Sequence, residues 1–264
     1  MTAFPSISVL LPSANGRFAG TALDCFLAQS YKGEMELVVL DNADDDCLLF
    51  RVSKLVKPDS IEMLDGFTGF FALLANGQRV TYLSLPHRPI GALRNTGNWH
   101  ARGDIIVHFD DDDWQHPDRV SQQVARLLDT GKAVTGFHES LYVSEDTGKA
   151  YRYSYSPGRA HEPYAYGANL AYTRQWWEKH SFPETDSEDR PFTDAALHRQ
   201  QLDSCCGSQL IVCRIHGQNL CQKQNYLGRH KQWPEVKQSE VPGGFFEAMA
   251  AERASQISGT VGEQ

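Results

Sequence analysis

The chain has 264 residues, of which 41% are hydrophobic and 22% charged, so it is neither a disordered chain nor too short to bury a core. Its formal net charge of −8 argues against non-specific nucleic-acid binding and against a basic membrane-binding surface, although it does not exclude a local basic site. No apolar run approaches the ~18 residues that cross a bilayer, and the first ten residues lack the basic and apolar regions of a signal peptide. We therefore expect a soluble, cytoplasmic protein, with a peripheral membrane association left open.

The first 130 residues alternate short strands with helices. Aliphatic and β-branched runs predict strands at residues 7–11, 37–40, 80–85 and 104–109. We expect Pro12 to end the first strand, and Thr21 to cap the helix that follows it. Because these strands are apolar on both faces, they predict an α/β fold: a mostly parallel sheet flanked by helices on both faces.

The later elements are less regular. Pro117 is the expected first residue of a helix that ends near Gly131. Residues 48–78 lack a clear period and are interpreted as a helix plus an irregular insertion, whereas alternating aromatic residues predict strands within 134–155. Beyond about Ser255 we expect the chain to lose order.

Four consecutive aspartates, residues 110–113, follow the strand at 104–109. Ligands of open α/β sheets bind beyond the carboxyl ends of the strands. Adjacent carboxylates repel one another unless cations compensate them, and hard divalent cations prefer oxygen ligands. The run therefore points to a divalent metal, Mn²⁺ or Mg²⁺. The alternative is a solvated acidic turn before the next helix.

The ordered segments ISVLLPSANG, LVVLDNADDD and GALRNTGNWHARGDIIVHFDDDDWQHPDRV resemble the inverting family 2 of nucleotide-sugar glycosyltransferases, which have the GT-A fold. The resemblance covers about residues 7–128, with weaker similarity to about residue 219. It implies one GT-A domain with a nucleotide-sugar-binding half at 1–130 and an acceptor-binding, catalytic half at 131–240. A C-terminal helix and disordered tail are expected at 241–264.

The same resemblance implies that donor-binding residues lie in the first two strand ends and in one helix. Pro12, Ser13 and Asn15 match the first loop, and Asp41 matches the residue that binds the base of the nucleotide. Arg94, in LRNTG, matches an arginine that faces the nucleotide. The competing interpretations are an ordinary turn aspartate for Asp41 and a surface ion pair for Arg94.

Within the aspartate run, the position of Pro117 sets the alignment with the family. Asp112 is then expected to ligate the metal, and Asp110 to contact the ribose or a metal-bound water. Asp111 occupies the variable place and could substitute for either. His216, in the segment RIHGQN, is the second expected metal ligand, with a buried core histidine as the alternative.

The acceptor side is expected in the second half of the chain. The segment SEDRPF resembles the family's Glu-Asp helix start, so Asp189 is the expected general base and Glu188 its alternate; a helix-capping role is the competing interpretation. Tyr166, Trp176 and Trp177 are expected to line the acceptor pocket, against the alternative of core packing.

The resemblance predicts a metal-dependent inverting glycosyltransferase that moves a sugar from a nucleotide-diphosphate sugar, with a UDP-sugar favoured, to an acceptor hydroxyl. A glycan or lipid-linked glycan is the favoured acceptor, and the net charge disfavours nucleic acid. The alternative is a catalytically inactive GT-A protein that binds nucleotide or metal in regulation or assembly. We favour the enzyme because the Glu-Asp start and the HGQN segment occur together. The sequence leaves the donor sugar, linkage and oligomeric state open.

Overall fold

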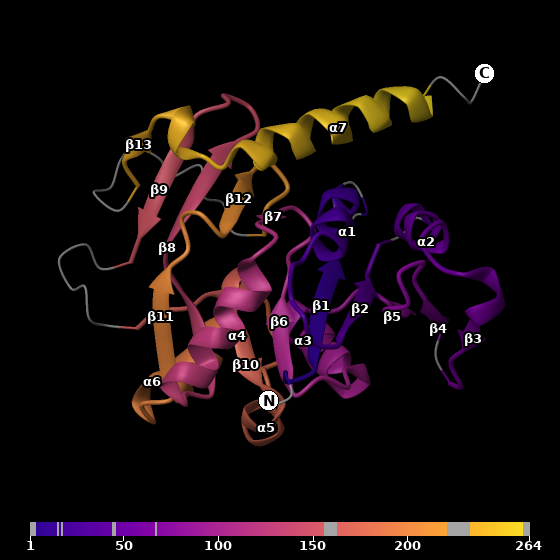
Figure 1. Cartoon of the computed structure of the whole chain (residues 1–264), viewed down its shortest axis with the longest axis horizontal. Coiled ribbons are helices and arrows are strands. Elements are labelled where there is room, and N and C mark those ends of the chain that lie inside the picture. The colour runs from indigo at the N-terminus through magenta and orange to yellow at the C-terminus, as the bar shows by residue number, and fades with distance from the viewer. Residues whose placement is uncertain are drawn as a thin grey trace.

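A mixed β-sheet of thirteen strands forms the centre of the protein in the computed structural model, which describes residues 4–14, 16, 18–43, 46–66, 68–155, 163–220 and 233–260. Its main path runs β13-β9-β8-β10-β6-β1-β2-β5-β4-β3 (Figure 1). The strands are β1 (Ile7–Ser13), β2 (Met35–Asp41), β3 (Glu62–Met63), β4 (Thr68–Leu73), β5 (Arg79–Ser84), β6 (Ile105–His108), β7 (Trp114–Gln115), β8 (Val134–Ser144), β9 (Ala150–Ser154), β10 (Ala171–Thr173), β11 (Leu202–Cys206), β12 (Ile211–Ile215) and β13 (Glu235–Val236). The α-helices are α1 (Ala19–Leu27), α2 (Cys47–Ser53), α3 (Ile90–His100), α4 (Arg119–Thr130), α5 (Arg174–Lys179), α6 (Asp189–His198) and α7 (Gly243–Thr260).

Alternation along the central strands produces two helical layers. Val9 and Leu11 of β1 belong to a core cluster that includes residues of α1, α2, α4 and α7. The residue between them, Leu10, belongs to a second cluster with residues of α3, α5 and α6. Because successive strand residues point to opposite faces, a strand covered by helices on both sides carries apolar residues on both of its faces. The predicted α/β architecture, with helices on both faces, is confirmed.

The four predicted strands pair in parallel at the centre of the sheet. β1 lies between β2 and β6, and β2 also pairs with β5, all in parallel. The register places Ser13 opposite Asp41, and Leu10 opposite His108 at the end of β6. The carboxyl ends of β1, β2 and β6 therefore lie at one edge of the sheet, where the aspartate run begins.

The expectation that Pro12 ends the first strand is wrong, since β1 continues to Ser13. The reason is the local hydrogen-bond pattern. The Leu10 carbonyl accepts a bond from Phe109 N at 2.9 Å, so Leu10 and, two residues later, Pro12 present their backbone groups to the β6 side. β6 ends opposite Leu10, so the missing N–H of Pro12 breaks no ladder bond.

The helix starts differ from those predicted. Helix α1 begins at Ala19 with Phe18 at its N-cap, and the Thr21 hydroxyl donates to Glu252 of α7 at 2.7 Å instead of capping. Helix α4 begins at Arg119, two residues after Pro117. The predicted C-cap is confirmed, since Gly131 has a left-handed φ of 62° that favours glycine.

Residues 48–78 contain strands that the sequence analysis missed. After α2 and a 3₁₀ turn (η1, Pro58–Ser60), β3 and β4 form an antiparallel hairpin, and β4 pairs antiparallel with β5. Phe70 and Ala72 are buried while Leu73 is exposed. The strand is short, so its alternation between buried and exposed residues covers too few positions to be recognised as a period in the sequence. The strands predicted within 134–155 are confirmed as β8 and β9.

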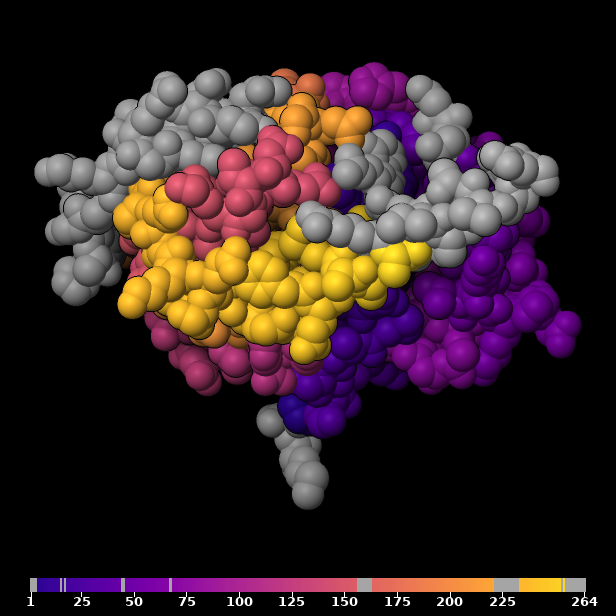
Figure 2. All heavy atoms as spheres, turned by 90° about the horizontal axis from the view of Figure 1, so that it is seen from above, coloured from indigo at the N-terminus to yellow at the C-terminus, as the bar shows by residue number. Residues whose placement is uncertain are grey.

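Helix α7 crosses the molecule at the edge where β1 ends (Figure 1) and lies along the N-terminal segment, as the space-filling view shows (Figure 2). Its backbone is helical to Thr260, beyond the point where the sequence suggested loss of order. Of the helices in the described ranges, none combines the length with the apolar character needed to cross a bilayer.

Candidate functional site

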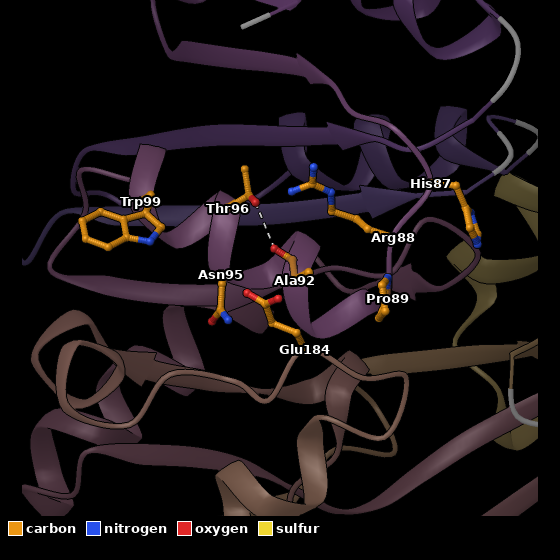
Figure 3. Close-up of a pocket in the computed structure, with 8 residues that line it drawn as sticks. All are labelled: His87, Arg88, Pro89, Ala92, Asn95, Thr96, Trp99 and Glu184. Carbon is orange, nitrogen blue, oxygen red and sulfur yellow. Dashed lines mark hydrogen bonds between the residues drawn. The ribbon is translucent and has the colours of Figure 1, made fainter. Parts of the chain in front are cut away.

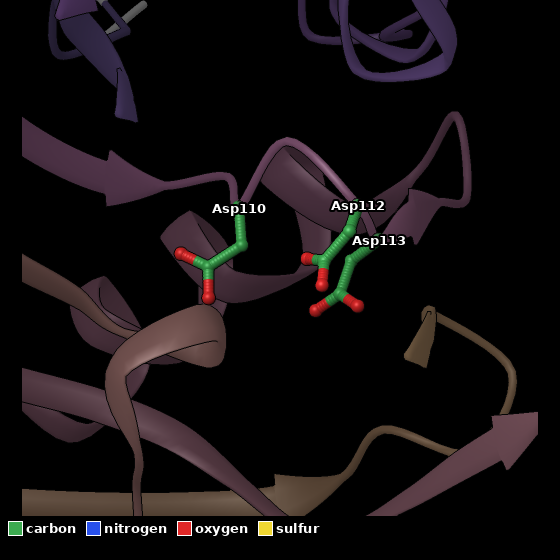
Figure 4. Close-up of side chains that lie close together, drawn as sticks. All are labelled: Asp110, Asp112 and Asp113. Atoms are coloured by element: carbon green, nitrogen blue, oxygen red, sulfur yellow. The ribbon is translucent and has the colours of Figure 1, made fainter. Parts of the chain in front are cut away.

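The aspartate run forms a cluster of carboxylates at the end of β6. Asp110, Asp112 and Asp113 each bring one carboxylate oxygen within 4.8 Å of the others, and their side chains project to the same side of the loop (Figure 4). Asp113 is buried, whereas Asp110 and Asp112 are half-buried. Sequence reasoning had not assigned Asp113 to the metal, although its place in the run was the available signal.

A segment about one hundred residues later supplies polar atoms to this cluster. His216 Nε2 lies 3.0 Å from Asp112 Oδ2, and Asn219 Nδ2 donates to the same oxygen at 2.8 Å. The two side chains come from the loop after β12, and His216 is itself buried. The structure thus brings together the two predicted metal ligands, Asp112 and His216. Sequence reasoning gave no role to Asn219, although the spacing of His216 and Asn219 in RIHGQN was a usable signal.

The backbone of β12 fixes the other side of the cluster. Arg214 N donates to Asp113 Oδ1 at 3.1 Å, and Asn219 Nδ2 lies 3.3 Å from Arg214 O. β12 also pairs with β7, which directly follows the aspartate run. The geometry of the carboxylates therefore depends on β12 as well as on β6.

The predicted donor-side residues border the cluster. Ser13 Oγ donates to Asp111 Oδ2 at 2.6 Å, and burial together with the neighbouring charge of Asp112 raises the pKa of Asp111. Asp41, at the end of β2, is buried; its carboxylate accepts bonds from the Tyr82 hydroxyl and, at 3.0 Å, from Ala43 N. Asn15 lies outside the described residues.

Arg94 joins the donor side to the predicted acceptor side. It is buried in α3, and its guanidinium pairs with Glu188 through Nη1 and with Asp110 through Nη2 at 3.3 Å. Both interactions raise the pKa of Arg94, against the opposing effect of burial. Burial raises the pKa of Glu188, while Arg94 opposes this rise. Arg94 is therefore a buried ion-pair partner of two site carboxylates, and the surface ion pair considered above is wrong.

Asp189 and Glu188 occupy different environments. Glu188 is buried and is the N-cap residue of α6, without a side-chain capping bond. Asp189 is half-buried, and its Oδ2 accepts a hydrogen bond from Gly167 N at 2.9 Å. The next residue before this glycine, Tyr166, donates its hydroxyl to Ser140 Oγ at 2.8 Å. The backbone at Gly167 thus brings Tyr166 near Asp189 in the fold, and the role of Tyr166 toward an acceptor stays a prediction.

The two tryptophans lie elsewhere. Trp176 and Trp177 are buried in the cluster beneath α3 and α6, and Trp177 Nε1 donates to Asn95 Oδ1 at 3.0 Å. Their helix follows Thr173, which pairs with Ile105 at the start of β6. They therefore lie at the opposite end of β6 from the aspartates, and the expectation that they line the acceptor pocket is replaced by core packing.

A hollow of about 460 Å³ lies against α3 (Figure 3). It is lined by residues of the loop before α3, by one face of α3 and by Glu184. Trp99, at its far end, is 78% exposed. None of the residues predicted for the donor, metal or base lines it.

The chemistry of the carboxylate cluster fits a divalent cation. Three carboxylate oxygens and an imidazole nitrogen converge from two segments, and such a donor set suits Mn²⁺ or Mg²⁺. Of the positive side chains near the cluster, Arg94 is shared between Asp110 and Glu188, and buried Arg119 bonds Gln115, Gln123 and the Ala168 carbonyl. Burial, and after it the charges of Asp112 and Asp110, raise the pKa of Asp111.

Comparison with solved structures finds GT-A glycosyltransferases of low sequence identity. TarS of S. aureus has a TM-score of 0.57 at 17% identity, with 80% of this chain and 37% of that chain covered. The mannosyltransferase PcManGT from Pyrobaculum calidifontis, solved with GDP-Man and Mn²⁺, has a TM-score of 0.58 at 17% identity, covering 83% of this chain and 59% of that one. Glucosyl-3-phosphoglycerate synthase from Mycobacterium tuberculosis, solved with Mn²⁺, UDP and phosphoglyceric acid, has a TM-score of 0.54 at 17% identity, covering 80% and 72%. The chain thus spans less than two thirds of the first two proteins.

Comparison with curated protein sequences gives no match. A family model, in contrast, covers most of the chain. The model described as "Glycosyl transferase family 2" matches residues 8–191, which include β1, β2, β6, the aspartate run and the Glu188–Asp189 pair. The chain belongs to glycosyl transferase family 2 and has the GT-A fold.

Proposed function

We propose that the protein is a metal-dependent inverting glycosyltransferase that transfers a sugar from a nucleotide-diphosphate sugar to an acceptor hydroxyl. The observation that carries this proposal is the meeting of two distant segments, Asp110–Asp113 and His216–Asn219, at the carboxyl edge of the sheet. Family membership and the nucleotide-sugars or nucleotides bound by similar structures support the same class of reaction. A divalent metal agrees with the Mn²⁺ named in two of those structures.

We assign the donor to the region between Asp41 and the aspartate run. Asp41 would accept from the base, and Ser13 and Pro12 would contact the nucleotide with their neighbouring backbone. Asp112 and His216 would hold the metal, with Asp110 and Asp113 at its border. When bound, the metal would neutralise the charge of the departing diphosphate. We favour a UDP-sugar because UDP or a UDP-sugar is bound in several of the similar structures.

The base would act from the opposite side of the sugar. In an inverting displacement, the acceptor oxygen forms a bond to the anomeric carbon while the bond to the diphosphate breaks, and the diphosphate leaves with the electron pair. The acceptor proton passes to a carboxylate, which we assign to Asp189. Asp189 is half-buried, whereas Glu188 is already paired with Arg94. Arg94 would hold Glu188 and Asp110 at a fixed separation, and thereby the donor and acceptor sides.

The metal and donor assignments can be tested by thermal unfolding with UDP and GDP, each in Mn²⁺ or in EDTA. A ligand that binds the native state raises the midpoint, so we expect UDP with Mn²⁺ to give the largest rise. Asp112→Asn should remove the Mn²⁺-dependent part. Asp129→Asn, at an exposed position of α4, is the matched control and should behave as wild type. Equal stabilisation in EDTA would overturn the metal dependence, and a larger effect of GDP would overturn the choice of nucleotide.

The stereochemistry requires a separate measurement. We expect proton NMR during slow hydrolysis of a UDP-α-sugar to show the β anomer first, because water would replace the acceptor on the inverted face. The α anomer as the first product would indicate retention. No turnover with several UDP-sugars and GDP-sugars, together with tight nucleotide binding, would instead support an inactive binding protein.

A further inference from the structure

Helix α7 is connected to the candidate metal site through the buried carboxylate of Glu252. Glu252 lies on α7, where its side chain is 4% exposed, and its Oε2 is 2.6 Å from Arg214 Nη2. Arg214 is also buried, with its side chain 2% exposed. Thr21 of α1 completes the group, since its hydroxyl lies 2.7 Å from Glu252 Oε2 and 3.1 Å from Arg214 Nη2. Three elements distant in sequence therefore meet at one ion pair.

Arg214 connects this ion pair to the metal-site carboxylates through its backbone. Its N–H donates to Asp113 Oδ1, and its carbonyl accepts from Asn219, which also donates to Asp112. A shift of the Arg214 side chain would therefore move the strand that orients both aspartates. Outer-shell groups of this kind fix the orientation of metal ligands.

A second connection runs through an aromatic ring. The Arg214 guanidinium carbon lies 5.0 Å from the centre of the Phe18 ring. The His216 imidazole packs on the same ring, with 4.6 Å between the two ring centroids. Phe18 is 2% exposed, so its position is set by this packing. Phe18 thus lies in contact with both the arginine and the proposed metal ligand.

The start of helix α7 borders a hollow and is anchored by apolar contacts. A hollow of about 370 Å³ lies between its first turns, α1 and the loop at residues 114–117. Phe245 is fully buried and anchors the start of the helix by apolar contact. The Glu252–Arg214 pair is therefore an anchor of different chemistry, and through the Arg214 backbone it connects to the metal-site carboxylates.

We propose that Glu252 is a positioning residue for the metal site: through Arg214 it holds β12, His216 and Asp113 in the geometry that binds the divalent ion. This inference rests on the proposed function, because it assumes that the cluster binds a metal. The family match ends at residue 191, so neither Glu252 nor Arg214 lies within the matched segment. α7 is on this view a part of the site, although it supplies no ligand.

The test measures Mn²⁺ affinity of the full chain, by the electron paramagnetic resonance signal of free Mn²⁺, without nucleotide or turnover. Glu252→Gln keeps the size of the side chain and removes its charge, and we expect the Mn²⁺ dissociation constant to rise about tenfold. Thr21→Val, which removes the bridging hydroxyl but keeps both charges, should give a smaller rise of about threefold. The Thr21→Val variant tests the role of this hydrogen-bonded group even if Glu252→Gln does not fold.

Two controls separate positioning from simple loss of stability. Glu247→Gln changes an exposed residue of the same helix and should leave Mn²⁺ affinity unchanged. Phe245→Ala should lower the unfolding midpoint, yet leave the affinity of the folded protein near wild type, because Phe245 packs in the apolar core cluster and the hydrogen-bonded group of Glu252, Arg214 and Thr21 does not include it. If Phe245→Ala weakens Mn²⁺ binding as much as Glu252→Gln does, the specific role of Glu252 is overturned.

The variants also distinguish a failure of the positioning role from a failure of the proposed function. Wild-type affinity in Glu252→Gln and Thr21→Val, with weakened binding in Asp112→Asn, would overturn the positioning role alone. A wild-type protein that binds no Mn²⁺ would overturn the metal site and, with it, the positioning role. Weakened binding in Glu252→Gln, Thr21→Val and Asp112→Asn, with normal binding in both controls, is the result that supports the inference.

Discussion

Replacing Arg94 by Met tests whether the buried arginine holds the two sides of the site together. Met fills a similar volume without charge, so the change leaves Glu188 and Asp110 without their shared partner. The side chains of Arg94 and Glu188 are 3% and 5% exposed. We therefore expect a loss of stability rather than a local effect on nucleotide binding.

The magnitude follows from this burial. Removing one partner of a buried ion pair costs about 3–5 kcal/mol, because the other charge remains without compensation. Domains are stable by about 5–15 kcal/mol in total, so Arg94→Met should retain a measurable but reduced transition. Adding Glu188→Gln removes the orphaned charge. The double variant should then recover about 2–3 kcal/mol relative to the sum of the single changes.

The loss should also depend on pH. Burial already raises the pKa of Glu188, and Arg94 is what opposes this rise. Without Arg94 the folded-state pKa lies still further above that of the unfolded chain. Glu188 then contributes most favourably when it is protonated in both states, and this contribution is lost as the pH rises through its folded-state pKa. The destabilisation by Arg94→Met should therefore be smaller at pH 5 than at pH 8.

Urea unfolding followed by circular dichroism at both pH values measures these quantities for wild type, the two single variants and the double variant. A loss below about 1 kcal/mol in Arg94→Met, or strict additivity in the double variant, would refute the buried ion pair as a stabilising link. A larger loss at pH 5 than at pH 8 would refute the assignment of the orphaned charge to Glu188.

Three further predictions concern the donor, the base and the packing of α3. Asp41→Asn keeps an acceptor for the Tyr82 hydroxyl and should weaken UDP binding by about 1–3 kcal/mol in calorimetry; unchanged affinity would make Asp41 a turn residue. Asp189→Asn should leave the unfolding midpoint near wild type, since Asn keeps an oxygen that can accept the bond from Gly167 N, but lower turnover by about 10²–10⁴-fold; wild-type turnover would place the base elsewhere. Gly91→Ala should destabilise by about 1–3 kcal/mol, because a Cβ there would lie 1.9 Å from Pro183 O and 2.9 Å from Glu188 Cβ. A near-neutral result in urea unfolding would show that this loop yields easily.

Much of the central sheet could be predicted because its signal is local. Residues 37–40 of β2 are apolar and polar residues follow them, so composition alone indicates burial on both faces. The edge hairpin of β3 and β4 was missed because two-residue strands and a six-residue strand give too few repeats for a period to emerge. Pro12 misled the analysis because its effect depends on where the neighbouring strand ends, which is a property of the pairing and not of residues 7–13.

The candidate site was predictable to the extent that its residues stand in recognisable spacing. The approach of His216 to Asp112 agrees with the segment RIHGQN. The prediction for Trp176 and Trp177 was wrong because an adjacent pair of aromatic residues has the same sequence pattern in a core as in a sugar-binding pocket. The contact of Glu252 with Arg214 had no signal at all, since the charge of a helix residue does not reveal which distant partner will bury it.

The completion of the aspartate cluster by β12 has a consequence for how the protein folds. β7 pairs with β12 across about one hundred residues of intervening chain, and β12 also pairs in parallel with β8. Forming contacts between residues this far apart in sequence first costs loop-closure entropy, and such contacts slow folding. A chain emerging from the ribosome exposes the four aspartates well before β12 has been synthesised. The final arrangement of the cluster therefore has to wait until β12 is available to pair with β7.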